Sequence, residues 1–490
     1  MKAKKMMAQV FVFLLVIGLL AACNRDSGNQ SPDNTPTTGA SAAVGGDADA
    51  SNAVEEPDDE VTGTAPVRGG MGGPTPEIPV GSDLPDTLAN PNISIVYWYE
   101  QNAYQNNVSI NPNYYNEILD AIPVFEEMYG GTVEYINVPW NDMIPRAVEM
   151  MSAGQAPDII LIFDRTFHNL ALNGNLTPLN EYVNDNDYNI WGISKDLFTW
   201  KGEVYAIPNR PYPTLFAFNR DMLDMAGLGH PDVLFERGEW TFDKFMEIVL
   251  ATTRYRDGEM ITQGVGTWPG DGTARFMLAN GTSLYNVDPT GGFATSNLTT
   301  AALQHTLDWM GTWASGPEPA WNPGNDTNNQ FQNGNIAMVD TIGYFSEVFP
   351  FAYGLVPYPT GPFGPDKGLV TMPQAWAVPI GSQNVEGAVA FIRLSQQIFA
   401  TEGLRREKLN FEQFISPSAW ESIFGDPDTV TLYSYDKSTA NIDRIFGEMI
   451  NLMLDRVPAA TIVERLEPML VADLRQAFEG YGDGAVFEDE

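Results

Sequence analysis

The stretch AlaProAspIleIleLeuIlePhe (156–163) decides the predicted fold, because an uninterrupted apolar run follows a turn-forming proline. A run that is apolar on both faces is typical of a strand buried within a parallel sheet. Upstream, 114–129 has apolar residues at helical spacing and lies between two β-rich runs, 93–99 and 132–138. A second, shorter helical segment ends at Gly154. This alternation predicts an α/β fold with a parallel sheet covered by helices.

The alternation continues after a proline-rich break, AsnArgProTyrPro (209–213). Short extended runs are predicted on either side of this break, at 204–207 and 214–218. Pro211 and Pro213 restrict the backbone φ angle there, which suits a segment with a defined path. Further strands are predicted at 337–340, 353–356 and 370–378, and further helices at 241–253, 300–313, 385–399, 439–456 and 462–479.

Composition excludes several classes of function. The 490 residues include 63 Asp and Glu but only 26 Lys and Arg, a formal charge of −37. Nucleic acids and anionic membrane surfaces are bound through excess basic residues, so neither is an expected partner. One cysteine and three histidines exclude a disulfide framework and leave little for a metal site. We therefore expect no metal and no cofactor.

The N-terminus has the order of a secretory signal. Lys2, Lys4 and Lys5 precede an apolar run at 10–20, and the only cysteine, Cys23, follows LeuAlaAla. This order resembles the lipobox of bacterial lipoproteins, in which the cysteine is lipidated. We expect 1–22 to be a lipoprotein signal peptide. Residues 23–90 are then the lipidated cysteine and a disordered acidic spacer, because they hold too few apolar side chains to fold.

Three segments together resemble the extracytoplasmic solute-binding proteins of bacterial ABC importers, family 1, the maltose/oligosaccharide-binding type. The first is 143–160, the second runs from LysGlyGluValTyrAlaIlePro (201–208) to GluTrpThrPheAspLysPhe (239–245), and the third runs from PheGlnAsnGlyAsnIleAlaMetVal (331–339) to TrpAlaValProIle (376–380). Their order and spacing match the family.

The resemblance implies a two-lobed α/β fold of the periplasmic-binding-protein (Venus flytrap) type, whose hinge-connected lobes close over a ligand. We expect lobe 1 to comprise 91–210 plus 370–432 and lobe 2 to comprise 211–369 plus 433–480, followed by a frayed acidic tail at 481–490. The implied partners are a carbohydrate and the membrane-spanning permease subunits of an ABC transporter with their ATPase. We expect a monomer that is held at the extracytoplasmic face of the membrane by its lipid.

A sugar ring offers an apolar C–H face and a rim of hydroxyls, so its site needs flat aromatic side chains beside polar ones. In α/β sheets such groups lie beyond the carboxyl ends of the strands. Asp164, Tyr212 and Tyr344 match the ligand-contacting positions of the family best, whereas the family's acidic residue at the first hinge is absent here. The candidate ligand-binding residues are Trp98, Glu100, Asp164, Arg210, Tyr212, Trp268, Tyr344 and Trp376.

Alternatives remain for the residues and for the function. Trp and Tyr are frequently packing residues, and Asp164 could cap the next helix. The rival function is a secreted, lipid-anchored carbohydrate-active hydrolase, which needs two suitably spaced carboxylates. A surface scaffold is disfavoured because no repeat of fixed period is present. No hydrolase motif such as GlyXaaSerXaaGly or HisGluXaaXaaHis occurs, so we favour a non-catalytic receptor.

Overall fold

A computed structural model describes most of the chain after residue 83. The predicted signal peptide at 1–22, Cys23, the predicted spacer up to 83 and the tail at 481–490 lie outside the described residues. The spacer was predicted to extend to residue 90, but Leu84 and Leu88 pack against the hydrophobic core and the Tyr129 hydroxyl donates to the Pro85 carbonyl at 2.9 Å, so the folded part begins before residue 91. The described ranges are 84–110, 115–185, 187, 195–208, 210, 212–288, 290, 292–322, 327–342, 349–365, 370–371, 374–424, 431–432 and 441–479.

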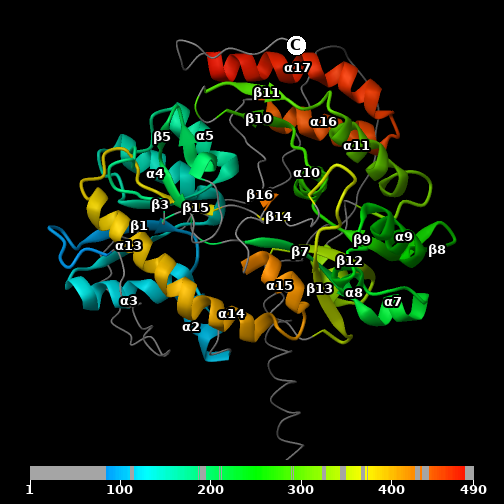
Figure 1. The fold of residues 1–490 in the computed structure, drawn as a ribbon, viewed down its shortest axis with the longest axis horizontal. Coiled ribbons are helices and arrows are strands. Elements are labelled where there is room, and N and C mark those ends of the chain that lie inside the picture. The colour runs from blue at the N-terminus through cyan, green and yellow to red at the C-terminus, as the bar shows by residue number, and fades with distance from the viewer. Residues whose placement is uncertain are drawn as a thin grey trace, which may run out of the picture. The chain divides into compact units, whose positions relative to one another are not determined.

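The first sheet is built on the apolar strand that the sequence singles out. Every residue of this strand, β3 (Ile159–Phe163), is buried. β1 is parallel to both β2 and β3, whereas β15 runs antiparallel to β3 and β6. Helices α3 and α13 cover one side of the sheet, and α4 and α5 the other (Figure 1). The sheet order is β2 (Val133–Asn137), β1 (Ile93–Tyr97), β3, β15 (Gln374–Ala377) and β6 (Ala206–Pro208), and the helices are α3 (Glu117–Tyr129), α13 (Val385–Ile398), α4 (Met143–Ser152) and α5 (Asp164–Leu172).

Aromatic side chains from helices pack against the second sheet and form its core. Phe216 of its central strand packs against Phe245 and Phe276, and Phe242 stacks on Trp309 with ring centroids 3.9 Å apart. The strand order is β16 (Thr431–Leu432), β14 (Val370–Thr371), β7 (Pro213–Asn219), β12 (Ile336–Ile342), β9 (Glu259–Gly266) and β8 (Arg254–Arg256), and β13 (Tyr353–Pro357) also pairs with β7. The aromatic side chains come from β7, α9 (Phe242–Thr252), α10 (Pro269–Ala279) and α11 (Ala301–Ala314).

The strand predicted at 370–378 is two strands that belong to different sheets. β14 pairs with β7 in the second sheet, and β15 pairs with β3 in the first. Pro373 interrupts the run in the sequence, and a proline cannot donate a hydrogen bond to a strand ladder. The chain therefore passes between the sheets three times among the described strands, from β6 to β7, from β14 to β15, and from β15 to β16.

The segment after α13 differs from the expectation that 370–432 belongs wholly to lobe 1. β16 pairs with β14 in the second sheet. Ala419 and Ile423 of α15 (Pro417–Phe424) share an apolar cluster with Leu215 of β7 and Phe331. Burial of this apolar face draws the helix to the second lobe.

The remaining helices and strands complete the two lobes. Helix α13 continues through a π-helical turn, Phe399–Gly403, into α14 (Leu404–Phe411). The other elements are α2 (Gln101–Ile110), the 3-10 helices η2 (Trp140–Asp142) and η3 (Lys195–Phe198), β4 (Thr199–Trp200), β5 (Glu203–Val204), α7 (Arg220–Ala226), α8 (Pro231–Glu236), β10 (Tyr285–Val287), β11 (Ala294–Ser296), α12 (Thr327–Gln332), α16 (Ile442–Leu454) and α17 (Ala459–Glu479).

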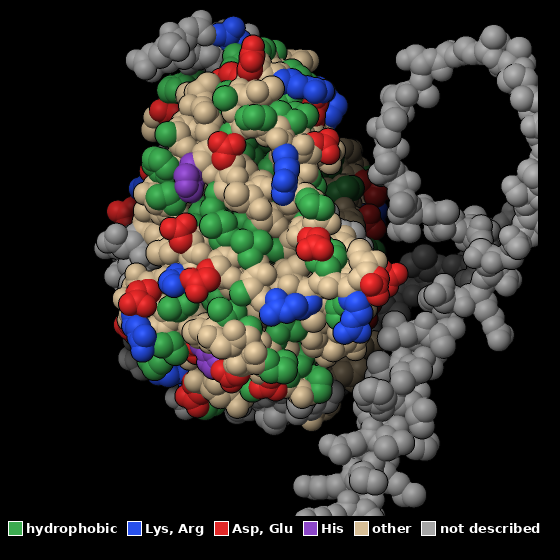
Figure 2. Space-filling model, turned by 90° about the vertical axis from the view of Figure 1, so that its right-hand side faces the viewer, with side chains coloured by type: hydrophobic (Ala, Val, Ile, Leu, Met, Phe, Trp, Pro, Cys, Tyr) green, Lys and Arg blue, Asp and Glu red, His purple; other side chains and the backbone are tan. Residues whose placement is uncertain are grey.

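The surface is of mixed charge where it can be seen. Acidic and basic side chains are interspersed on the face in Figure 2, with apolar side chains between them. Within the described ranges, no helix is both long and apolar enough to span a membrane.

Candidate ligand-binding site

An aromatic cluster lies beyond the carboxyl ends of the parallel strands in the first sheet. Trp98 follows β1 directly, is half-buried, and packs edge-on against Tyr99 and Trp140, each with ring centroids 5.1 Å away. Trp140 follows β2 and also packs against Phe163 at the end of β3, at 4.8 Å. Parallel strands bring their carboxyl ends to one edge of a sheet, which explains why these rings meet.

Trp140 was missed by the sequence prediction. It comes directly after Val138-Pro139, two residues beyond the predicted strand at 132–138. The placement that selected Trp98 applies equally to Trp140, so strand-end position alone could have found it. Glu100 lies two residues after Trp98 and its side chain is exposed.

Asp164 is the first residue of α5, directly after β3. The N-cap position of this helix belongs to Phe163, so Asp164 does not take the capping place that the sequence allowed. Its side chain lies outside the described part of the structure, as does all of Tyr344. Beside Asp164, the guanidinium of Arg165 lies 5.4 Å from the centre of the Phe163 ring.

Arg210 lies in a buried ion-pair cluster between β6 and β7. It is 3% exposed, pairs with Glu407 of α14, and its Nε lies 3.5 Å from Oε2 of Glu117 on α3. The hydroxyl of Tyr212 donates to Oε1 of the same Glu117 at 2.7 Å. Because the Arg210 guanidinium faces core carboxylates, its position argues against the predicted contact with a ligand.

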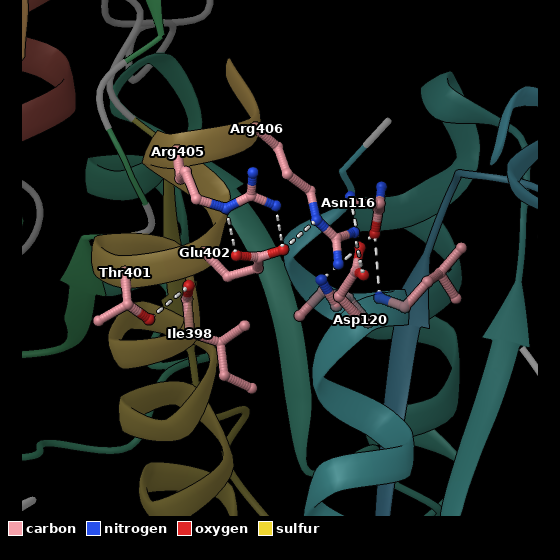
Figure 3. Close-up of polar contacts among 9 residues, drawn as sticks. Asn116, Asp120, Ile398, Thr401, Glu402, Arg405 and Arg406 are labelled. Carbon is pink, nitrogen blue, oxygen red and sulfur yellow. Dashed lines mark hydrogen bonds and ion pairs between the residues drawn. The ribbon is translucent and has the colours of Figure 1, made fainter. Parts of the chain in front are cut away.

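The ion pairs continue from Glu117 along α3. Asn116 caps this helix by accepting hydrogen bonds from the backbone of Ile118 and Leu119. One turn later, Asp120 accepts a hydrogen bond from Nη1 of Arg406 at 3.1 Å, and Arg406 also donates to Glu402 at 2.8 Å (Figure 3). We call Glu117, Asp120, Arg210, Arg406 and Glu407 the crossing cluster.

The crossing cluster contains three carboxylates and two guanidinium groups, all of them buried. Burial raises the pKa of the Asp120 and Glu407 carboxyls, and the nearby charge of Glu117 adds to the effect at Glu407. At the edge of the cluster, hydrogen bonds from Arg405 and then Arg406 lower the pKa of Glu402 to about 2. The pKa values of neighbouring carboxyl groups are therefore shifted in opposite directions.

Trp376 is fully buried at the centre of the first sheet. Its position in β15 is 0% exposed, and its ring is tilted against Tyr97 at 5.5 Å. The prediction selected Trp376 because the return strand was expected to border the site. The structure places its strand between β3 and β6, and the fully buried side chain presents no ring face to a ligand.

Trp268 is the candidate that the structure exposes most clearly. It follows β9 of the second sheet, is 60% exposed, and takes the N-cap position of α10. Since β9 is parallel to β12, Trp268 also lies beyond the carboxyl end of a strand. Five of the eight candidates thus fall into three groups: Trp98 with Glu100, Arg210 with Tyr212, and Trp268 in the second lobe. Trp376 is buried, and the Asp164 side chain and Tyr344 lie outside the described residues.

A small apolar cavity borders the crossing cluster. It is lined by Arg210, Tyr212 and Glu407 and by side chains from β7 and α15, including Leu215 and Trp420. The volume of this cavity is close to that of one water molecule, so it is too small for a sugar ring. Among the described residues, no group of three or more His, Cys, Asp or Glu side chains is placed to hold a metal.

Two α/β lobes joined by crossing strands, with aromatic side chains beyond the strand ends of each, define a two-lobed binding-protein fold. The model of the bacterial extracellular solute-binding protein family matches residues 107–395, more than half of the chain. The chain therefore belongs to this family.

Relatives and solved structures agree with this assignment. A protein of Brucella abortus (strain 2308) named as a binding protein is 24% identical over 260 residues, which are 51% of this chain and 61% of that relative. The chain thus matches less than two thirds of the relative's length.

Three solved structures share the fold at low sequence identity. An ABC substrate-binding protein from Listeria monocytogenes in complex with cycloalternan has a TM-score of 0.57 at 15% identity, covering 81% of this chain and 100% of that one. A sugar transporter from Rhizobium etli in an open conformation has 0.59 at 15%, covering 78% and 99%. UgpB from Mycobacterium tuberculosis in complex with glycerophosphocholine has 0.59 at 17%, covering 79% and 98%.

Proposed function

We propose that this protein is a non-catalytic extracytoplasmic receptor. It captures a carbohydrate, most simply an oligosaccharide, between its lobes and delivers it to the permease of an ABC transporter. The observation that carries this proposal is the placement of aromatic side chains beyond the strand ends of both lobes. Trp98 and Trp140 provide rings in the first lobe, and the exposed Trp268 provides one in the second.

Charge favours an uncharged ligand. The formal charge of −37 disfavours anions, and Arg210, the basic candidate from the sequence, is paired with Glu407. Cycloalternan, bound by the Listeria protein, is a saccharide, whereas the glycerophosphocholine bound by UgpB carries a phosphate. Aromatic rings with polar neighbours suit the former, because they stack on the apolar face of a sugar. We therefore assign the carbohydrate class.

Attachment and closure complete the proposal. Cys23 carries a lipid that holds the chain at the membrane, and the acidic segment that ends before residue 84 serves as a spacer of some tens of ångströms. The lobes rotate about the crossings between β6 and β7 and between β14 and β15, and ligand favours the closed form through contacts with both lobes. Palmitate labelling of the wild type and of Cys23→Ala tests the anchor.

Calorimetric titration against a panel of neutral oligosaccharides tests the function. Trp98→Ala and Trp268→Ala should each weaken binding at least about tenfold, equivalent to about 1.4 kcal/mol, because each removes one stacking face. Phe363→Ala is the matched control. Phe363 is 51% exposed, and its backbone N–H donates a hydrogen bond to Oδ1 of Asn280 at the far end of α10, about 18 Å along the helix from Trp268.

Two outcomes would contradict the proposal. Unchanged affinity in both tryptophan variants would remove the stacking site, and absence of binding to every saccharide would remove the ligand class. Shortened sugars in the titration mixture would instead favour the hydrolase. Scattering measured with and without ligand checks closure separately, since a receptor that closes becomes more compact on binding.

A further inference from the structure

The residue before Trp268 is tied to the centre of the second sheet. Thr267 lies between β9 and α10 and is buried. Its Oγ1 donates a hydrogen bond to Oδ2 of Asp340 at 3.0 Å. Asp340 is buried on β12, the strand that pairs with β9, so the end of one strand is held by its neighbour.

The same carboxylate also holds the helix that begins at Trp268. Arg275 lies seven residues, about two turns, further along α10 and pairs through Nη1 with Asp340. Its Nη2 lies 3.7 Å from Asp271 in the first turn. Asp340 therefore fixes both the turn that carries Trp268 and the helix that follows it.

Close packing surrounds this turn. The carbonyl of Thr267 accepts a hydrogen bond from Nε1 of Trp321 at 3.2 Å. The backbone N–H of Gly272 donates to the carbonyl of Trp268 at 2.7 Å. A Cβ atom at Gly272 would lie only 1.9 Å from Oγ1 of Thr267, so glycine is required for this approach. The backbone of Trp268 is thus fixed although its side chain is exposed.

We propose that Thr267, Asp340 and Arg275 are positioning residues that hold Trp268 ready for ligand. An exposed aromatic ring normally loses motional freedom when a ligand stacks on it, which weakens binding. A ring whose backbone is fixed in advance loses less, so the buried Thr267–Asp340 contact acts on affinity through Trp268. This inference rests on the proposed carbohydrate-binding function.

Thr267→Val tests the inference with little change in shape, because it replaces only the hydroxyl by a methyl group. Affinity for the saccharide found in the panel should fall about fivefold, the effect of one lost hydrogen bond. In a Trp268→Ala background the same change should cause no further loss, because a positioning effect vanishes with the ring that it positions. Thr267→Ser, which restores the hydroxyl, should recover the affinity.

Thr252→Val is the matched control, since Thr252 is a buried threonine of the same lobe whose Oγ1 donates to the Ile248 carbonyl at 2.8 Å. It should leave affinity unchanged in both backgrounds. An equal loss from Thr267→Val with and without Trp268, or no loss in either, would overturn the inference.

A second readout needs no ligand. In protein labelled with 5-fluorotryptophan, the fluorine resonance of Trp268, assigned by its loss in Trp268→Phe, should shift in Thr267→Val but not in Thr252→Val. If the wild type binds no saccharide while this shift is seen, the proposed function fails and the structural coupling stands. If the wild type binds and the resonance does not move, the positioning inference alone fails.

Discussion

The crossing cluster and the Asp340–Arg275 pair bury charge in different ways. The crossing cluster has three carboxylates for two guanidinium groups, whereas the pair in the second lobe has one of each at its core. The crossing cluster also joins α3 to segments far away in sequence, since Arg210 and Glu407 are 197 residues apart. The second-lobe pair joins one strand to a nearby helix.

The two arrangements of buried charge are suited to different roles. A balanced pair leaves no excess charge in the interior, so it fixes geometry, as proposed for Trp268. An unbalanced cluster leaves one buried carboxylate in excess; burial raises the pKa of Asp120 and Glu407, and the charge of Glu117 adds to the rise at Glu407. The chain segment between the lobes is thus held by contacts whose strength depends on protonation.

The largest expected effect comes from removing the cation that serves two carboxylates. Arg210→Met should lower the free energy of unfolding by about 3–5 kcal/mol, because it leaves the buried carboxylates of Glu117 and Glu407 without the positive charge that they share. Urea denaturation followed by circular dichroism measures this loss.

Double substitutions test the difference in charge balance between the two sites. Arg275→Met should also lower the free energy of unfolding, because it leaves the Asp340 carboxylate buried without its cation. Adding Asp340→Asn should restore much of that stability, because neither member of the pair is then charged. Adding Glu407→Gln to Arg210→Met should restore less, because Glu117 stays charged. Equal recovery in the two pairs would contradict the difference in charge balance.

The sequence predicts the elements whose own pattern reveals their burial. The apolar run at 159–163 is β3, and the helical spacing in 114–129 and 241–253 predicts α3 and α9, each within a few residues. Helix α14 was not predicted, because only three of the eight residues in LeuArgArgGluLysLeuAsnPhe (404–411) are apolar and four consecutive residues are charged. Its Arg406 and Glu407 are buried through partners on α3 and before β7, and such pairing is visible only once the chain is folded.

Among the candidate site residues, too, some positions are predictable from the sequence pattern and others are decided only by folding. Trp98 and Trp268 lie where strand ends place them, since that rule needs only the order of elements. Trp376 and Arg210 were selected by position along the chain, but their neighbours in space decide their burial. The rule for strand ends predicts location, whereas exposure depends on what packs against the face of the sheet. Trp376 lies within the inner strand β15, not beyond its end, and its buried ring packs against Tyr97.

The pH dependence of stability separates two carboxyls that titrate in opposite directions. Glu407 has a folded pKa above its ordinary value of 4.5, so the stability that it contributes is present below pH 4.5 and is lost as pH rises through the folded pKa. Glu402 has a folded pKa of about 2, so its contribution is present above pH 4.5 and is lost as pH falls toward 2.

Urea denaturation at a series of pH values from 2 to 8 checks both signs. Relative to the wild type, Glu407→Gln should remove a decline in stability above pH 4.5 of about 1.4 kcal/mol for each unit of raised pKa. Glu402→Gln should remove a rise in stability between pH 2 and 4.5, and partial exposure of Glu402 limits that rise to about 1 kcal/mol. Parallel pH profiles for the two variants would contradict the opposite pKa shifts of Glu407 and Glu402.

The smallest effect is expected where the same ion-pair distance occurs at the surface. Arg146 and Glu149 lie 2.7 Å apart with side chains 47% and 68% exposed, whereas Arg393 and Asp187 lie 2.7 Å apart with 16% and 6% exposed. Glu149→Gln should change the free energy of unfolding by less than about 0.5 kcal/mol, because water and salt screen the exposed pair. Asp187→Asn should cost about 1.5–3 kcal/mol, because its charge-assisted bonds are shielded from water. When denaturation is repeated in low and high salt, only the small stability change caused by Glu149→Gln should depend on the salt concentration. If both variants lost equal stability, distance rather than burial would govern these pairs, and the contrast between the crossing cluster and the rest of the molecule would lose its physical basis.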